Sequence, residues 1–297
     1  MPPAFVLVLS LLALAYLARK LGRFPDSASD VLNRFVIDLC VPAVLLRLLP
    51  TLHFEWELLA LVATPWLLAL AAFALTRAAA RALHLAPQTE AVLFLCTALG
   101  NTSFLGFPMC IALLGEGALK YAAVYDQLGS FLLLAIVAPV VVARASGAGR
   151  PSLWQTVKRV LTFPPFIALI LALLPLPRPA YVEPVLEQVG AALTPVAIFA
   201  VGLRLRITPP KEGAAFVLGL LLKLGLLPLL AWGIASALAP SRAVLEVAVL
   251  ESAMPAMVTA GALAMAAGIA PELAAALVGW GVVAALVTVP AWAALLH

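Results

Sequence analysis

The feature that most constrains this chain is a succession of apolar segments, each long enough to cross a lipid bilayer. A membrane-spanning helix needs roughly 20 residues, and ten such segments follow one another with short connections between them. They cover residues 3–21, 30–50, 57–80, 89–115, 117–143, 160–177, 181–205, 212–238, 241–268 and 271–296. The chain is 65% hydrophobic and 11% charged, whereas soluble domains are about 25% charged. We therefore predict an all-α integral membrane protein with ten transmembrane helices and no soluble domain.

The basic residues gather at one end of these segments. Those that follow the first, third, fifth and seventh segments are Arg19, Lys20, Arg23, Arg77, Arg81, Arg144, Arg150, Lys158, Arg159, Arg204, Arg206 and Lys211. The opposite ends carry only Arg47, Lys120, Arg178 and Arg242. Because positively charged loops stay in the cytoplasm, we predict a multi-pass protein of the cell membrane, the inner membrane in a bacterium, with both termini outside. The charges form short separate groups, so nucleic acid is not an expected partner.

The fourth segment cannot be one smooth helix. Its middle carries Gly100, Asn101, Thr102, Ser103, Gly106 and Pro108. Proline removes an amide donor, and glycine and short polar side chains favour other backbone conformations. Backbone groups that are freed inside a membrane must find partners within the protein. An interrupted helix at that depth is therefore a typical place for a ligand to bind.

The two halves of the chain match each other at an offset of 151 to 153 residues. Pro42 falls on Pro195, Pro139 falls on Pro290, and the break in the fourth segment falls near residues 252–255 of the ninth. Because each half has five segments, the second half must be inverted relative to the first. Inverted repeats with matching broken helices are typical of secondary transporters. We therefore predict one repeat at 1–150 and a second at 151–297, with helices 4 and 9 broken and crossing.

Short motifs along nearly the whole chain resemble the auxin efflux carrier family, which includes PIN-type carriers of plants and malonate and malate permeases of bacteria. The motifs are Leu32-Asn33-Arg34-Phe35, Pro42-Ala43, Gly100-Asn101-Thr102-Ser103-Phe104-Leu105-Gly106-Phe107-Pro108, Tyr125-Asp126-Gln127-Leu128-Gly129, Thr194-Pro195, Val201-Gly202-Leu203, Lys223-Leu224, Pro228 and Ala253-Met254-Pro255. The motifs of the fourth and ninth segments are the most specific.

The resemblance implies a fold of the bile-acid-symporter type and a small organic anion as substrate, either an auxin-like monocarboxylate or an acid of the malonate and malate type. Helices 1, 2, 6 and 7 would form a scaffold, and helices 3–5 and 8–10 would form a mobile transport core. Transport would proceed by elevator-type alternating access. The resemblance also implies a homodimer that assembles through the scaffold.

The two breaks reach nearly the same depth in the membrane. A rise of about 1.5 Å per residue, across a hydrocarbon core of roughly 30 Å, places Asn101 and Glu251 near its middle. At such a crossing, half-helices present amide-bearing ends to anions and carbonyl ends to cations. We therefore predict a substrate site that comprises Asn101, Thr102, Ser103, Gly106, Pro108, Met254 and Pro255. Capping of the severed helix ends is the alternative role for its polar side chains.

Four ionisable residues share this depth, and charges there commonly mark a functional site or a mutual pair. Asp126, Lys223 and Glu251 fall in the expected transport core, where Lys223 pairs with one of the carboxylates and the group exchanges a coupling proton. A static buried ion pair is the alternative. Asp38 falls on the expected scaffold, where it hydrogen-bonds the seventh helix or helps to hold water or a sodium ion.

Other classes of function find less support. A proton or sodium exchanger that uses the same carboxylates is the alternative within transport. The absence of an arginine from the middle of the spans weighs against a dicarboxylate, which favours a bidentate guanidinium. The histidines His53, His84 and His297 are scattered, and the three cysteines fall inside spans as small apolar residues. We therefore expect no enzyme, no metal site and no cofactor. The six tryptophans mostly fall toward span ends, as interfacial anchors do.

Overall fold

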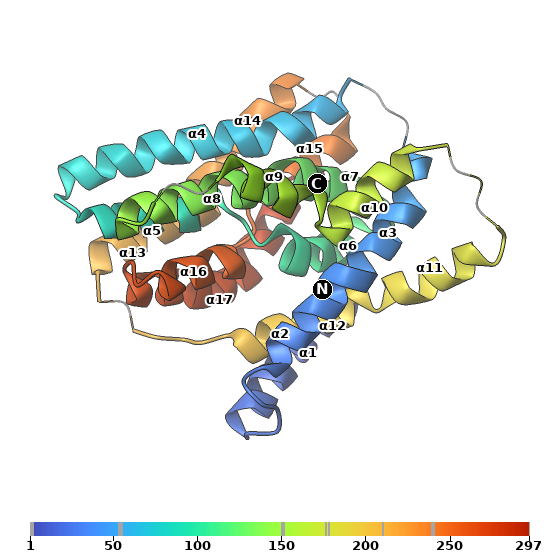
Figure 1. Ribbon diagram of the computed structural model, residues 1–297, viewed down its shortest axis with the longest axis horizontal. Helices are drawn as coiled ribbons and strands as arrows, with labels where there is room; N and C mark the ends of the chain where they lie inside the picture. Colours follow the sequence, from blue (N-terminus) through green and yellow to red (C-terminus); the bar gives the residue numbers. More distant parts are fainter. Residues whose placement is uncertain are drawn as a thin grey trace.

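The structure is a computed structural model that describes residues 3–52, 56–149, 152–175, 177, 179–209, 211–238 and 241–296. The described part of the chain is helical, and its one β-type pairing is an isolated bridge between Gly100 and Ala256. His53, Arg150, Arg178 and His297 lie outside the described residues, so the structure does not bear on the predictions that concern them. The all-α prediction is confirmed for the part that the structure describes (Figure 1).

Six helical stretches in the described residues are long and apolar enough to cross a membrane. Three of them are single helices: α1 (Pro3–Lys20), α4 (Leu58–Ala82) and α17 (Pro271–Leu296). The other three are composed of consecutive elements: η4 (Glu116–Ala118), α7 (Leu119–Tyr125), η5 (Asp126–Ser130) and α8 (Phe131–Ser146); α11 (Val182–Ala191) and α12 (Leu193–Arg204); and α13 (Gly213–Leu221), η6 (Leu222–Leu226) and α14 (Leu227–Leu238). A seventh is counted when α9 (Leu153–Leu161) and α10 (Pro164–Leu173), which are bent by 62°, form one span. The protein is thus a multi-pass membrane protein.

The three remaining predicted spans are interrupted. Residues 30–50 form α2 (Ala28–Phe35), η1 (Val36–Cys40), α3 (Val41–Leu48) and η2 (Leu49–Thr51). Residues 89–115 form α5 (Pro87–Ala98), η3 (Thr102–Gly106) and α6 (Phe107–Leu114), and residues 241–268 form α15 (Arg242–Ser252) and α16 (Val258–Ala266). The first of these is helical throughout and is interrupted only by its π-helical and 3-10 turns, but it carries four charged residues, Asp30, Arg34, Asp38 and Arg47. In the other two the helix itself is broken, at residues 99–101 and 253–257.

The helices gather into two groups. In one group α1 packs on α12, and α3 packs on α10 and α11; in the other, α4, α5, α13, α14, α16 and α17 lie together (Figure 1). Gly202 allows the close approach of α1 and α12, because a Cβ there would lie 2.6 Å from Ala15 Cβ and 2.8 Å from Leu12 O.

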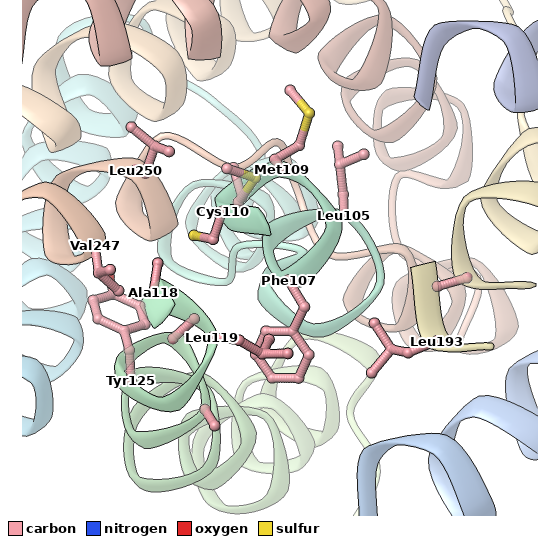
Figure 2. Packing of buried hydrophobic residues seen from close by; sticks show 14 of the residues in the cluster. Leu105, Phe107, Met109, Cys110, Ala118, Leu119, Tyr125, Leu193, Val247 and Leu250 are labelled. Carbon is pink, nitrogen blue, oxygen red and sulfur yellow. The ribbon is translucent and has the colours of Figure 1, made fainter. Parts of the chain in front are cut away.

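The two groups meet in a large apolar core. Figure 2 shows side chains of α6, α7, α12 and α15 converging there, among them Phe107, Leu119, Leu193 and Val247. Phe107 is fully buried in this cluster.

Four five-residue π-helical turns interrupt the helices, at η1, η3, η5 (Asp126–Ser130) and η6 (Leu222–Leu226). In three of them a proline stands two positions after the turn, as Pro42, Pro108 and Pro228. Proline cannot donate the i→i−4 hydrogen bond, so the helix accommodates it by widening one turn. Such turns frequently mark functional sites, and here they carry Asp38, Thr102, Asp126 and Lys223.

Candidate functional site: a paired backbone break with buried charges

The breaks in the fourth and ninth predicted spans lie against each other. The amide of Asn101 donates to the carbonyl of Pro255 at 2.8 Å, and the amide of Met257 donates to the carbonyl of Leu99 at 2.9 Å. These two bonds make the antiparallel bridge between Gly100 and Ala256. Four backbone groups freed by the breaks are therefore satisfied between the two breaks themselves, as the membrane interior requires.

Asp126 is the centre of a hydroxyl cluster. Its carboxylate, 1% exposed, accepts hydrogen bonds from Thr102 Oγ1, from Ser103 Oγ at 2.7 Å and from Gln127 Nε2 at 2.7 Å. Thr102 and Ser103 lie on η3, at the start of the second half-helix, and they connect it to the π-helical turn η5. Charge-assisted bonds of this kind are stronger than those between neutral groups. The hydroxyl groups beside the break and the carboxylate of Asp126 thus form one hydrogen-bonded cluster.

Asn101 is not a capping residue in the structure. Its side chain makes no capping hydrogen bond to the following turn, and its Nδ2 is buried without a hydrogen-bond partner among the described residues. Thr102 and Ser103 likewise direct their hydroxyls to Asp126 rather than to helix amides. Buried polar groups are normally hydrogen-bonded, so the side-chain amide of Asn101 is a donor that lacks its acceptor among the described residues.

Glu251 lies in the last turn of α15 and is fully buried. Cys110 Sγ donates to its Oε1 at 3.4 Å, while its Oε2 has no partner in the part of the chain that the structure describes. Gly106 contacts the same carboxylate so closely that a Cβ at this position would overlap Oε2. The glycine in η3 therefore leaves room for the buried carboxylate beside it.

Lys223 approaches the break from η6. It is 5% exposed, and its Nζ donates to the carbonyl of Ser252 at 3.1 Å. A Cβ on Gly100 would lie 3.1 Å from this Nζ, which shows how closely the lysine meets the break. Neither Asp126 nor Glu251 lies within 4.0 Å of the ammonium, so the direct ion pair that the sequence suggested is not formed in this structure.

Two tryptophans hold the π-helical turns that carry the charges. Trp66 Nε1 donates to the carbonyl of Leu128 in η5 at 2.9 Å, and Trp292 Nε1 donates to the carbonyl of Leu224 in η6 at 2.8 Å. The second bond replaces one that Pro228, four residues on, cannot make. At these two positions the indole therefore has a hydrogen-bond partner inside the protein. Pro228 marks the carbonyl of Leu224 as one that needs another donor, but the sequence carries no such mark for Leu128 and does not identify either indole as the donor.

The remaining predicted residues divide between this site and the surface. Pro108, Met254 and Pro255 are buried at the paired breaks. Asp38, in contrast, is exposed and makes no hydrogen bond among the described residues, so the expected bond to the seventh helix is absent. Val36 and Cys40 are the buried residues of η1, and Asp38 stands between them on the opposite face of the turn. It does not join Asp126, Lys223 and Glu251.

Two cavities lie where the two groups of helices meet. One, of about 260 Å³, is lined by Arg204 and Leu203 at the C-terminal end of α12 together with Val258 of α16. The other, of about 230 Å³, is lined by Thr194 at the N-terminal end of α12 together with Ile111 of α6. The cavities therefore flank the contact between the groups at opposite ends of one helix. No group of three or more His, Cys, Asp or Glu among the described residues is placed to hold a metal ion.

Membrane-spanning helices, a paired break at their centre and a cluster of buried charges define the class of multi-pass membrane transporters. The chain belongs to the membrane transport protein family, whose model matches residues 1–151 and 149–293. This confirms the predicted membership of the auxin efflux carrier family. The chain is similar to an uncharacterized transporter of Methanothermobacter thermautotrophicus (strain Delta H), with 26% identity over 97% of this chain and 96% of the relative.

Proposed function

We propose that this transporter moves a small organic anion by secondary active transport, with the paired breaks as its substrate site. The observation that carries the proposal is the side-chain amide of Asn101, whose Nδ2 is a buried donor without a partner among the described residues, at a backbone break. The ammonium of Lys223, with one hydrogen bond to a carbonyl, lies beside the same break. Two such donors suit a carboxylate. Asn101, Thr102, Ser103, Gly106, Pro108, Met254 and Pro255 would line this site.

The donors favour an acid with one carboxylate, such as an auxin-like compound, over a malonate- or malate-type acid. A dicarboxylate would ordinarily be held by a guanidinium. Arg47, which falls within a predicted span, is instead engaged by Glu183 at 3.1 Å and Glu187 at 2.8 Å. Arg34, the other arginine of that span, is exposed on α2, on the predicted scaffold. The single positive charge of Lys223 matches one carboxylate.

Asp126 and Glu251 are proposed to carry a coupling proton. Both carboxyl groups are buried at the paired breaks, where an uncompensated charge is costly, and Glu251 Oε2 offers an acceptor without a partner among the described residues. Sodium is the other candidate for the coupling ion. The second candidate function, a proton or sodium exchanger, needs the same two carboxylates and no organic substrate.

The proposed movement is of the elevator type. In this proposal ten spans form two inverted repeats, helices 4 and 9 cross at the breaks, and helices 3–5 and 8–10 move against a scaffold of helices 1, 2, 6 and 7. The cavities at opposite ends of α12 support it, because they lie where alternating access would open. The distribution of basic residues supports a location of both termini outside, which for a bacterial protein means the inner membrane with the termini outside, and the scaffold would carry a homodimer contact.

Uptake into liposomes tests the proposal. Purified protein is assayed with indole-3-acetate, malonate and malate under an imposed pH gradient, with and without sodium. Asn101→Leu removes the unpartnered donor at similar volume, and Thr288→Val, in α17, is a control in which another buried polar group becomes apolar. We expect monocarboxylate uptake that falls at least tenfold in Asn101→Leu, about 1.4 kcal/mol, and persists in Thr288→Val. Ion movement without uptake of any acid would support the exchanger instead.

A further inference from the structure

A third cavity lies away from the paired breaks, between α4, α5 and α8. Its volume is about 370 Å³, within the range of about 300–1,000 Å³ that is usual for ligand pockets. The helices meet here at the C-terminal ends of α4 and α8 and the N-terminal end of α5. These are the ends at which the basic residues gather, and we therefore predict that they face the cytoplasm.

One wall of this cavity is positively charged. Arg77 Nη1 forms a two-pronged contact with Glu90, at 2.9 Å to Oε1 and 2.8 Å to Oε2. Arg144, on α8, also lines the cavity and has no hydrogen-bond or ion-pair partner among the described residues. The Arg77–Glu90 pair is neutral overall, so Arg144 leaves one uncompensated positive charge at the cavity.

The other wall is apolar and leads to the surface that faces lipid. Phe73 and Phe94 form an edge-to-face pair with ring centroids 5.8 Å apart, and Val141 adds to this wall. Phe73 is 56% exposed, and Leu70, one turn before it on α4, is 67% exposed. An exposed apolar stripe on a membrane-spanning helix lies against acyl chains. The cavity thus joins a cationic end to a hydrocarbon-facing side.

We propose that this cavity binds the headgroup of an anionic phospholipid. The phosphate would lie against Arg144 and the paired Arg77, and the acyl chains would run along Phe73 and Leu70. Basic pockets between helices at the cytoplasmic surface commonly bind anionic headgroups. The apolar wall distinguishes a lipid from a free anion, which would gain nothing from it. The site is separate from the proposed transport site, so either assignment can fail without the other.

Lipid titration of purified, delipidated protein followed by native mass spectrometry tests the proposal. The probes are dioleoylphosphatidylglycerol, dioleoylphosphatidylcholine and inorganic phosphate. Arg144→Gln removes the free charge, and Arg81→Gln, exposed on the same end of α4 but outside the cavity, is the matched control. Ala145→Phe fills the cavity without changing its charge.

We expect the wild-type protein to prefer the phosphatidylglycerol over the phosphatidylcholine. Arg144→Gln should weaken phosphatidylglycerol binding about fivefold, the effect of about 1 kcal/mol per basic residue, and Ala145→Phe should weaken both lipids at this site. Arg81→Gln should bind as the wild type does. Equal losses in Arg144→Gln and Arg81→Gln would overturn the proposal. Displacement of the lipid by inorganic phosphate at equal concentration would assign the site to a free anion and overturn it as well.

Discussion

The contact between Gly106 and Glu251 makes a sharp prediction about stability. In Gly106→Ala the new Cβ would overlap Oε2 of Glu251 and lie 2.8 Å from both Cδ and Oε1. The carboxylate is fully buried, so it has no solvent to move into. Overpacking a buried site costs about 1–3 kcal/mol. We expect Gly106→Ala to lower the free energy of unfolding by that amount relative to a control that gains only the helix propensity of alanine.

Gly233→Ala is that control. Gly233 lies within α14, and a Cβ there meets no atom within 4 Å. Both substitutions gain the roughly 0.5–1 kcal/mol by which alanine exceeds glycine in a helix, so the difference between them measures the contact with Glu251. The two variants are compared by thermal unfolding in detergent, which is followed by tryptophan fluorescence. Each kcal/mol of difference in their stability should shift Tm by about 2–4 °C.

A double-mutant cycle with Glu251→Ala assigns the cost to the carboxylate. Truncation of Glu251 leaves room for the new methyl group, so Gly106→Ala should become as stable as Gly233→Ala in that background. The coupling energy should then be about 1–3 kcal/mol, well above the error for independent sites. Equal melting of Gly106→Ala and Gly233→Ala in the wild-type background would refute the contact. A difference that persists in Glu251→Ala would refute its cause.

Four further substitutions, with Trp154→Phe as a control, test the packing of the helices. Trp66→Phe and Trp292→Phe each leave a carbonyl of a π-helical turn without its indole donor, which should cost about 1–3 kcal/mol in thermal unfolding. Trp154→Phe, at a 72% exposed position, should be near neutral, and equal effects at all three tryptophans would contradict the assignment. Arg47→Gln breaks two partly exposed ion pairs, so its cost should stay below about 1 kcal/mol. Gly202→Ala forces α1 and α12 apart and should cost about 1–3 kcal/mol by the same melting assay; a neutral result would show that these helices pack less closely.

Local sequence rules predicted the features that depend on neighbouring residues. Glycine and proline marked the breaks at 99–101 and near Pro255, because their effect on the backbone is local. The contact of Arg242 with Glu246, four residues apart in α15, is local in the same sense, with Nε 2.6 Å from Oε1. Apolar length predicted a multi-pass protein, while the division into ten inverted spans stays a prediction.

Tertiary contacts lay beyond such rules. Depth counting brought Asp126, Lys223 and Glu251 into one region, but it could not show that Lys223 bonds the carbonyl of Ser252 instead of a carboxylate. The same counting grouped Asp38 with them, since it measures height along a helix and not the face of the helix. The side of a π-helical turn on which a residue lies depends on the helices packed around it, and a single sequence does not contain that information.

The pH dependence of transport tests the central claim most directly. Uptake of the organic acid identified in the liposome assay is measured across a pH series for wild type, Asp126→Asn and Glu251→Gln, with Thr288→Val as the control. If the paired breaks bind the anion and the two buried carboxylates carry the coupling proton, both variants should lose the response to an imposed pH gradient, while Thr288→Val keeps it. Wild-type pH dependence in both Asp126→Asn and Glu251→Gln would contradict the account.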